Sequence, residues 1–469
     1  MKSNLRKIPG SIVAPKGFLA SGVFCDIKRL GTGKGSNKGQ KRDLALIVSE
    51  VPATVAGMFT TNQVCAAPVK VCIERMKKGV AQAIVAGLFT TNQVCAAPVK
   101  VCVERVKKGG AQAIVANSGN ANACTGKQGL KDARDMTALV AKHLHMPVEH
   151  VLVGSTGRIG VTLPMANVRA GISEAVTLLD HSPANADRAE EAIMTSDTRP
   201  KQIAVEFKLG RKTVRIGGIC KGAGLIQPGM SATGARPAAL HATMLCFITT
   251  DVAIDAKILR MALQEAVAQS FNRITVDGDM STNDTVLILA NGLAGNEKFK
   301  VQSSKFKVFQ SALNHVCLEL ARMIVRDGEG VHRVVTVRVD GAKTMRDADA
   351  AARAVANSLL VKTSWHGGDP NWGRIIDALG YSPAKVAGGK VDIGYSTVGS
   401  KKILWSLKRG QPTSASFKEL CAAVMPKEFD LHINLNLGKY GAVIYAADLT
   451  EAYVDFNKGD VGNPNSLGG

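Results

Sequence analysis

A segment of 30 residues occurs twice in succession in the first quarter of the chain. Residues 57–86 begin GMFTTNQVCAAPVKVC and residues 87–116 begin GLFTTNQVCAAPVKVC. The copies differ only at Met58/Leu88, Ile73/Val103, Met76/Val106 and Val80/Gly110. A solenoid needs about three stacked repeats, so two near-identical copies indicate a recent duplication of a strand-turn-helix segment. We expect one copy to occupy the place that the fold provides and the other to lie outside it.

The hydrophobic pattern of the remaining chain is that of a mixed α/β protein. Short apolar runs predict strands, and apolar residues spaced by three and four predict helices. The expected strands are 44–48, 113–115, 151–153, 203–207, 213–216, 246–250, 285–290 and 334–339. The expected helices are 130–144, 256–270, 309–325 and 346–360. A chain of 469 residues can form two or three domains, and we expect one α/β unit in each half.

Basic residues exceed acidic residues by 21 (59 against 38), and they are spread along the whole chain. The densest basic stretch, residues 29–42, mixes Lys and Arg with Gly, Ser and Asn. It has no aromatic side chain on which a nucleic-acid base could stack. The charge therefore favours a solvated surface that attracts anionic substrates, with no nucleic-acid partner.

The cysteine and histidine patterns argue against a disulfide framework and against a metal site. The ten cysteines form no CxxC pair, so we expect reduced, buried side chains. No HExxH motif occurs, and His143 and His145 lie two apart on an expected helix, where they would point to different faces. The prediction is therefore that no metal is bound. No apolar run approaches the roughly 20 residues that span a bilayer, and the first residues lack the apolar core of a secretion signal. We expect a cytoplasmic protein with no membrane partner.

The sequence contains no GxSxG elbow and no spacing typical of a Ser/His/Asp triad. The glycine-rich segment GTGKGSNKG at 31–39 does not match the GxxxxGK[ST] phosphate-binding loop, and a basic surface loop is the favoured interpretation. More informative are KGAGLIQPGM at 221–230 and ATMLCFITTD at 242–251. The second segment places a threonine directly before an apolar run with strand character.

These two segments resemble the self-cleavage region of the ornithine acetyltransferase (ArgJ) family. Members of that family cleave themselves before the threonine of an ATML sequence, and this threonine becomes the N-terminus of a second chain. The resemblance implies a scissile bond between Ala242 and Thr243, with Thr243 as the nucleophile. A threonine hydroxyl needs a base, and an α-amino group with a pKa of about 7.7–8.0 supplies one on the same residue.

Further motifs of the family follow in the same order along nearly the whole chain. NSGNANACTG at 117–126 resembles the family's oxyanion segment, which implies that Thr125 and Gly126 stabilise the tetrahedral intermediate. The motifs GSTGRIG (154–160), KGAG (221–224), RDGEG (326–330) and DLTEAYVDFN (448–457) imply that substrate is bound by Thr156, Lys221, Glu329 and Asn457, together with Thr243. Alone, each would be interpreted as a turn residue or a surface charge. The ordered set indicates a site.

The resemblance implies an ArgJ/DmpA-like two-lobed mixed α/β fold, self-cleaved into an alpha chain of residues 1–242 and a beta chain of residues 243–469. It implies transfer of acetyl from N2-acetyl-L-ornithine to L-glutamate, through an acetyl-threonine intermediate, in arginine biosynthesis. Some family members also use acetyl-CoA as the donor, and the sequence leaves that second activity open. The reaction needs no cofactor, and the family assembles as heterotetramers of two alpha and two beta chains.

Three features depart from the family pattern. The duplication lies directly before the oxyanion segment. Eleven residues, 231–241, are inserted before the expected scissile bond, and they include a second candidate threonine, Thr233. Five residues after Asn457, where the family has Thr or Ser, this chain has Gly462, and Ser466 is the hydroxyl residue that could substitute.

Three other functions compete with the acetyltransferase. A threonine- or serine-nucleophile aminopeptidase of similar architecture would hydrolyse peptides without transfer to glutamate. An uncleaved, inactive homologue, disabled by the insert before Thr243, would bind ligand without turnover. A basic nucleic-acid-associated protein would bind DNA in a salt-dependent manner. The order of the motifs favours the acetyltransferase.

Overall fold

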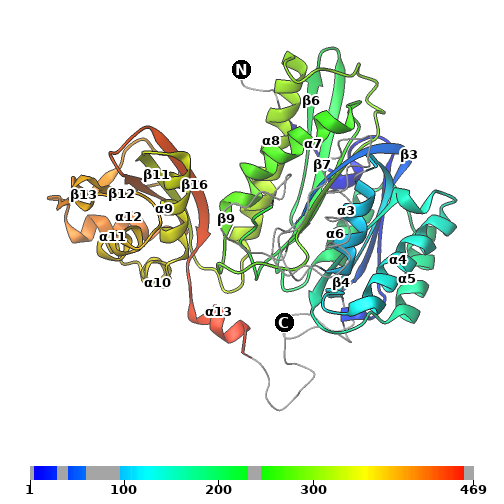
Figure 1. Ribbon diagram of the computed structural model, residues 1–469, viewed down its shortest axis with the longest axis horizontal. Helices are drawn as coiled ribbons and strands as arrows, with labels where there is room; N and C mark the ends of the chain where they lie inside the picture. Colours follow the sequence, from blue (N-terminus) through cyan, green and yellow to red (C-terminus); the bar gives the residue numbers. More distant parts are fainter. Residues whose placement is uncertain (1–4, 29–40, 60–95, 107, 231–243, 459–469) are drawn as a thin grey trace, which may run out of the picture. The chain divides into compact units, whose positions relative to one another are not determined.

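The structure, a computed structural model, describes residues 5–28, 41–59, 96–106, 108–230 and 244–458 (Figure 1). The chain divides into two compact units. The first comprises the described residues up to Asn272 together with Asp279–Ile324, and the second comprises Arg273–Gly278 and Val325–Lys458. These units are defined by packing, whereas the expected division at 242/243 is defined by cleavage. That division therefore stays a prediction.

The first unit is built on a nine-stranded mixed sheet. Its strands are β1 (Arg6–Lys7), β2 (Phe18–Val23), β3 (Leu44–Phe59), β4 (Gly110–Asn120), β5 (Val151–Arg158), β6 (Gln202–Leu209), β7 (Lys212–Lys221), β8 (Leu245–Thr250) and β10 (Thr285–Ala290). They follow the order β1-β6-β7-β8-β10-β3-β4-β5, and β2 also pairs with β3. Every residue of β8 and β10 is buried, as expected for parallel strands in the middle of a sheet that is covered on both faces.

The sheet folds back on itself at β3. Between Val48 and Ala53 the register of β3 against β4 shifts, and such an irregularity bends a strand. A Cβ on Gly154 of β5 would lie 3.1 Å from the ring of Phe247 on β8. Because β5 is four strands along from β8, a flat sheet would separate them by about 19 Å. The two parts of the sheet therefore face one another.

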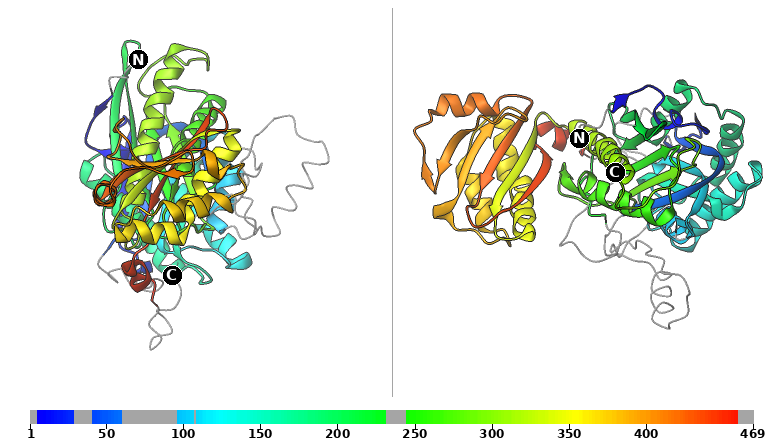
Figure 2. Two further views of the ribbon diagram at one scale, coloured as in Figure 1. Left: turned by 90° about the vertical axis from the view of Figure 1, so that its left-hand side faces the viewer. Right: turned by 90° about the horizontal axis from the view of Figure 1, so that it is seen from above.

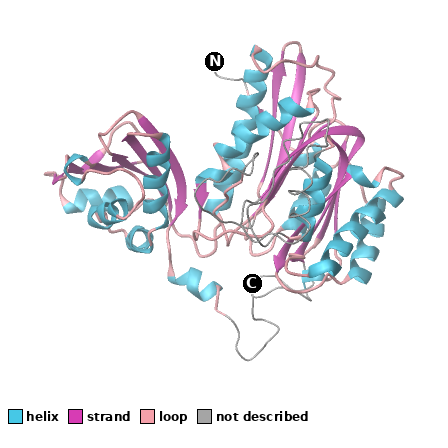
Figure 3. Cartoon of the chain, in the orientation of Figure 1, coloured by secondary structure: helices cyan, strands magenta, loops and turns pink. Residues whose placement is uncertain are grey.

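Helices pack against this sheet (Figure 3). They are α3 (Ala97–Val106), α4 (Gly126–His143), α5 (Met165–Thr177), α6 (Pro183–Ile193), α7 (Ala256–Ala268) and α8 (Ser304–Arg326), with 3-10 turns at Ser11–Val13, Val148–His150 and Phe271–Arg273. α3 packs on β5, α4 packs on α3 and α5, and α6 packs on β2 and β3. α8 contacts β7, since a Cβ on Gly218 would lie 2.9 Å from Leu320.

Both copies of the repeat contribute to this unit. Residues 57–59 of the first copy form the end of β3, and Ala97–Val106 of the second copy forms α3, which is followed by β4. Among the described residues, the strand end thus comes from the first copy and the helix from the second, and which copy occupies the place that the fold provides stays a prediction. α3 is packed into the core, where the Cys102 thiol donates to the Val153 carbonyl at 2.9 Å. Residues 60–95 lie outside the described part of the chain.

The second unit is a seven-stranded sheet with helices packed on one face (Figure 2). Its strands are β9 (Ile274–Thr275), β11 (Val334–Ala342), β12 (Asp392–Ser396), β13 (Leu404–Lys408), β14 (Gln411–Pro412), β15 (Glu428–Asn434) and β16 (Tyr440–Ala447), in the order β14-β13-β12-β15-β11-β16-β9. Its helices are α9 (Met345–Asn357), α10 (Leu359–Gly367), α11 (Trp372–Gly380), α12 (Phe417–Val424) and α13 (Glu451–Phe456), with a 3-10 turn at Gly388–Lys390. Val335, Val337 and Val339 alternate into a core shared with the alanines of α9, which is the period-two pattern of a half-covered sheet.

The expected mixed α/β class is confirmed, and each expected strand is present. The expected helix 346–360 is wrong in one respect, because Ser358 ends α9 and its side chain caps α10. His145 lies beyond the end of α4 and not on it. Of the seven described cysteines, none is in a disulfide and five are buried. In the described part of the chain, no helix has the length and apolar character needed to cross a membrane.

Candidate active site

Buried polar side chains gather in the first unit, where β7 ends and β8 and β10 begin. Protein interiors are mostly apolar, so buried charges need partners. Thr156, Asp197, Lys221 and Asp284 are each at most 2% exposed. Two of them, Thr156 and Lys221, are residues for which the family resemblance implies a substrate-binding role.

The segment between β4 and α4 carries the expected oxyanion pair. Thr125 directly precedes α4 without capping it through its side chain, and its Oγ1 donates to Oδ1 of Asn122 at 2.8 Å. Gly126 is the first residue of the helix. Its amide is one of those that a helix leaves without an internal partner, at the end where the helix dipole favours negative charge. Thr125 is half-buried and Gly126 is exposed, so this helix end is accessible to an anionic oxygen.

Gly129 makes room for this loop. A Cβ at that position would lie 1.8 Å from Oγ1 of Thr125 and 2.3 Å from Oδ1 of Asn122, which is far closer than a real contact. Asn122 also donates from Nδ2 to the Gly129 carbonyl at 2.8 Å. The φ angles of Asn122 (47°) and Cys124 (56°) lie in the left-handed region, which costs about 1–3 kcal/mol for such residues and is commonest at functional sites. The loop is thus held in one conformation by its neighbours.

Lys221 and Thr156 are brought together directly. The Lys221 ammonium donates to Oγ1 of Thr156 at 3.3 Å. Lys221 ends β7 and lies opposite Leu245 of β8, and Thr156 lies on β5. The fold-back of the sheet explains this contact, because β5 and β7 are far apart in strand order.

Asp197 lies behind Lys221 as a counter-ion. Its carboxylate is 4.0 Å from the Lys221 ammonium and 2.6 Å from the Lys201 ammonium, and it accepts the Gly222 amide at 2.7 Å. Burial alone would raise the pKa of Asp197, but the two ammonium groups and the Gly222 amide together hold it well below its usual range. Asp197 therefore remains an anion and compensates the buried Lys221 charge.

The residue that follows Thr243 is fixed by Asp284. The Met244 amide donates to Oδ1 of Asp284 at 2.6 Å, and the Met244 carbonyl accepts the Thr285 amide at 3.0 Å. Burial raises the pKa of Asp284 well above its usual value, and the Met244 amide and Lys221 oppose this only in part. Oδ2 of Asp284 is buried and has no hydrogen-bond partner among the described residues. A polar group is therefore available beside the start of β8.

Asn283, next to Asp284, joins the parts of the site. Its Nδ2 donates to the carbonyls of Ala121 and Ser155, each at 2.7 Å. Ala121 belongs to the oxyanion loop, and Ser155 is the neighbour of Thr156. One amide therefore links the oxyanion loop, β5 and the start of β10. Asn283 and Asp284 belong to the segment STNDT, for which the sequence predicted no chemistry. The signal that the sequence offered was this run of polar residues directly before an apolar strand.

Glu329 and Asn457 are brought together in the second unit. Nδ2 of Asn457 donates to Oε2 of Glu329 at 3.2 Å. The turn that carries Glu329 packs tightly on α13, because a Cβ on Gly330 would lie 2.3 Å from the Tyr453 amide. The Thr450 hydroxyl also donates to the Gly330 carbonyl at 2.6 Å. These two residues, 128 apart in sequence, therefore form a pair.

Several expected residues lie outside the described part of the chain. They are Ala242 and Thr243, the alternative Thr233, the glycine-rich segment 31–39 and the C-terminal Gly462 and Ser466. Their roles stay predictions. The insert 231–241 also lies there, but the residues that flank it are fixed. Met244 is held as described above, and Met230 is held by two hydrogen bonds to the Asn272 side chain, at 2.8 and 2.6 Å.

A comparison with protein families identifies the family of the chain. The ArgJ family model matches residues 28–86 and 80–459. The chain belongs to the ArgJ family. The two matched ranges overlap at residues 80–86, inside the repeat, which is the result expected for a duplicated segment. The family that the motifs predicted is thereby confirmed.

Curated relatives match over nearly the full length. The arginine biosynthesis bifunctional protein ArgJ of Symbiobacterium thermophilum is 44% identical and covers 96% of this chain and 98% of its own. The glutamate N-acetyltransferase of Methanocaldococcus jannaschii is 41% identical and covers 97% and 99%. These matches confirm the predicted enzyme class, an acetyltransferase of arginine biosynthesis. A solved structure of ornithine acetyltransferase complexed with ornithine, from Mycobacterium tuberculosis, is 32% identical, with a TM-score of 0.37, and covers 49% of this chain and 100% of that one.

Proposed function

We propose that this chain transfers the acetyl group of N2-acetyl-L-ornithine to L-glutamate, with Thr243 as the nucleophile after cleavage of the Ala242–Thr243 bond. The observation that carries the proposal is the fixed start of β8. Met244, which is bonded to Thr243, is held through its amide by Asp284 and through its carbonyl by Thr285. A nucleophile needs a rigid support of this kind, because small errors in position cost large factors in rate.

The reaction has two halves. In the first, the Thr243 hydroxyl attacks the acetyl carbon and its proton passes to the α-amino group of the same residue. The C–N bond then breaks, the departing ornithine amine takes that proton, and an acetyl ester remains on Thr243. In the second half, the glutamate amine attacks the ester and the C–O bond breaks. The threonine oxygen recovers a proton from the attacking amine, and N-acetylglutamate leaves.

Thr125 and Gly126 stabilise the oxyanion in both halves. Such donors are typically worth about 3–4 kcal/mol in the transition state. The Thr125 hydroxyl donates to Asn122 in the structure, so it exchanges that bond for one to the oxyanion. The exchange costs little, since a neutral hydrogen bond contributes only about 0.5–1.5 kcal/mol net. The amide of Gly126 and the dipole of the 18-residue helix α4 add to the positive potential.

The remaining expected residues bind the substrates. Lys221, with Thr156, pairs with the carboxylate that ornithine and glutamate share. Glu329 takes the side-chain ammonium of ornithine, and Asn457 orients Glu329 through the hydrogen bond between them. Acetyl-CoA as a second donor, a heterotetramer of two alpha and two beta chains, and a cytoplasmic location complete the proposal. They are supported by the family resemblance.

The proposal is tested by measuring ornithine release from N2-acetyl-L-ornithine with and without L-glutamate. We expect release that depends on glutamate in the wild type, none in Thr243→Ala, and partial retention in Thr243→Ser. Release that is independent of glutamate, together with hydrolysis of peptides, would favour the aminopeptidase. Binding of acetylornithine without any turnover would favour the inactive homologue.

A further inference from the structure

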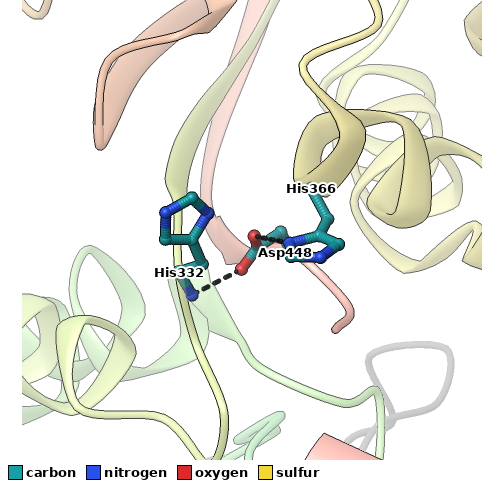
Figure 4. A group of neighbouring side chains, drawn as sticks. All are labelled: His332, His366 and Asp448. Carbon is teal, nitrogen blue, oxygen red and sulfur yellow. Dashed lines mark hydrogen bonds and ion pairs between the residues drawn. The ribbon is translucent and has the colours of Figure 1, made fainter. Parts of the chain in front are cut away.

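Two histidines and an aspartate meet in the second unit, at one end of the paired strands β11 and β16 (Figure 4). His332 lies two residues before β11, Asp448 directly follows β16, and His366 is near the end of α10. β11 and β16 are antiparallel neighbours in which Val334 pairs with Ala447. The sheet therefore brings His332 beside Asp448, and α10 adds His366. One ligand atom from each of the three side chains lies within 4.8 Å of the others.

Asp448 is aimed at His366 by its own hydrogen bond. The His332 amide donates to Oδ1 of Asp448 at 3.0 Å, which leaves Oδ2 3.5 Å from Nδ1 of His366. Asp448 is 4% exposed. Within the described chain, neither Oδ2 of Asp448 nor Nδ1 of His366 has a hydrogen-bond partner, although both atoms are buried. Buried polar atoms without partners are rare in native proteins and need an explanation.

The other ring nitrogen of His366 also faces a carboxylate. Nε2 of His366 lies 3.0 Å from Oε2 of Glu451. A neutral ring that donates from Nε2 to Glu451 presents the lone pair of Nδ1 to the carboxylate of Asp448, and these two acceptors repel each other. A neutral ring has only one N–H, so it can donate to Glu451 or to Asp448 but not to both. A cation between Nδ1 and Oδ2 would accept a lone pair from each atom and leave the Nε2–H for Glu451. A histidine that ligates a metal usually donates its other N–H to a carboxylate, which is the arrangement seen here.

We propose that His332, His366 and Asp448 bind a zinc ion, with Glu451 as the outer carboxylate that orients His366. Nitrogen and carboxylate ligands about 2.0–2.2 Å from zinc suit this donor set, and three protein ligands leave one position for water. Tetrahedral ligands at those lengths are about 3.4 Å apart, which the His366–Asp448 pair already approaches. His332 must therefore move closer to the other two ligands when the ion binds. Its ring is exposed and lies edge-on to the ring of His366, with 5.7 Å between the ring centres.

Two basic side chains lie close to this group, and both are occupied elsewhere. Arg333 donates to the Trp365 carbonyl at 2.9 Å and to the His366 carbonyl. The Lys362 ammonium donates to the Ala447 carbonyl. They are therefore tied to the backbone around the ligands and do not point at Oδ2 of Asp448 as its hydrogen-bond donors. Sequence spacing could not indicate this site, because its ligands are separated by 34 and 82 residues.

The test is titration of the metal-free full-length protein with Zn²⁺, followed calorimetrically, and with Co²⁺, followed by visible absorption. We expect one ion per chain and a Co²⁺ spectrum without thiolate charge-transfer bands, since no cysteine belongs to the ligand set. His332→Gln, which changes an exposed side chain and leaves the fold intact, is expected to lower the affinity about tenfold or more. His366→Gln is expected to lower it at least as much.

His315→Gln is the matched control, because His315 is an exposed histidine on α8 outside the group. It is expected to bind zinc as the wild type does. The proposal is overturned if the wild type takes up no zinc ion with defined stoichiometry. It is also overturned if His332→Gln and His366→Gln bind zinc as tightly as His315→Gln does. Neither result depends on acetyl transfer.

Discussion

The ammonium group of Lys221 donates a hydrogen bond to the hydroxyl of Thr156 at 3.3 Å. Lys221 ends β7 and Thr156 lies on β5, at the far side of the folded sheet. The contact ties the cation expected to bind substrate to the strand beside the oxyanion loop. Asp197, 4.0 Å behind the ammonium, compensates its charge.

Replacement of this cation should weaken substrate binding, while Lys201 and the Gly222 amide remain as partners of the buried Asp197 carboxylate. Lys221→Gln removes a charge-assisted bond to a substrate carboxylate, worth about 1.5–3 kcal/mol. We therefore expect KM for N2-acetyl-L-ornithine to rise roughly 10- to 100-fold in steady-state kinetics. Lys208→Gln is the matched control, since Lys208 makes the same kind of bond to the Thr213 hydroxyl on the surface. Equal kinetics for both variants would contradict a substrate-binding role for Lys221.

The absence of a side chain at Gly129 should be needed to keep the Thr125 hydroxyl, the proposed oxyanion donor, in position. Gly129→Ala places a methyl group 1.8 Å from Oγ1 of Thr125, so the hydroxyl must move. A displacement of about 1 Å can lower the rate about 100-fold, and we expect a fall in kcat of that order with little change in KM. Gly380→Ala, at the end of α11 with no atom within 4 Å of the new carbon, should leave kcat unchanged. A Gly129→Ala enzyme with normal kcat would exclude Thr125 from the oxyanion hole.

The hydrogen bond that holds the Met244 amide should need an acceptor atom at position 284 but no negative charge there. Because burial raises the pKa of Asp284 well above its usual value, a neutral Asn can replace it and still accept the Met244 amide. We expect Asp284→Asn to mature and turn over within a few-fold of the wild type. Asp284→Ala leaves that buried amide without a partner, which costs about 1–3 kcal/mol, and should slow cleavage and transfer. The measurements are the rate of fragment appearance and kcat. If Asn is as damaging as Ala, the charge of Asp284 is essential.

Glu190 should make the protein less stable as the pH rises. Burial raises its pKa from 4.5 to about 8, although the Lys201 amide and ammonium oppose this. Between these values the unfolded chain has lost the proton that the folded chain retains. The contribution of Glu190 to the free energy of unfolding is therefore greatest below about pH 4.5. It falls as the pH rises to about 8 and is then constant. Glu190→Gln, which mimics the protonated form, should remove this decline in urea unfolding series.

The neighbouring carboxylate supplies the control for that experiment. Glu191 is half-buried and pairs with Arg42 at 2.7 Å. Glu191→Gln should change stability by no more than about 1 kcal/mol and keep the decline seen in the wild type. If the Glu190→Gln and wild-type curves remain parallel from pH 5 to 8, then Glu190 is ionised in the folded protein over that range.

The local pattern of the sequence predicted the elements of the fold well. The apolar run 285–290 coincides with β10, and 246–250 is β8 without its first residue. The pattern could not predict that β3 continues to Phe59 and that the sheet folds back there. That feature arises from a register shift against β4, and register depends on a partner strand far away in the sequence.

For the site, too, the sequence predicted some features and not others. The motifs placed Thr156 and Lys221 in one site, and the structure brings them into contact. They gave no indication of Asp197 or Asp284, because the role of a buried carboxylate is set by its partners. Asp284 holds the amide of Met244, which lies 40 residues away, and no spacing rule connects the two. The Glu329–Asn457 pair was implied by the family resemblance, but the hydrogen bond between them was not.

The most direct test is a denaturing gel of the purified full-length protein, with N-terminal sequencing of each band. Cleavage before Thr243 predicts two fragments of nearly equal size, residues 1–242 and 243–469, the smaller of which begins TMLCFITT. A fragment that begins at Thr233 would place the nucleophile in the insert. A single intact band would contradict a nucleophile formed by self-cleavage, and the inactive homologue would become the better interpretation.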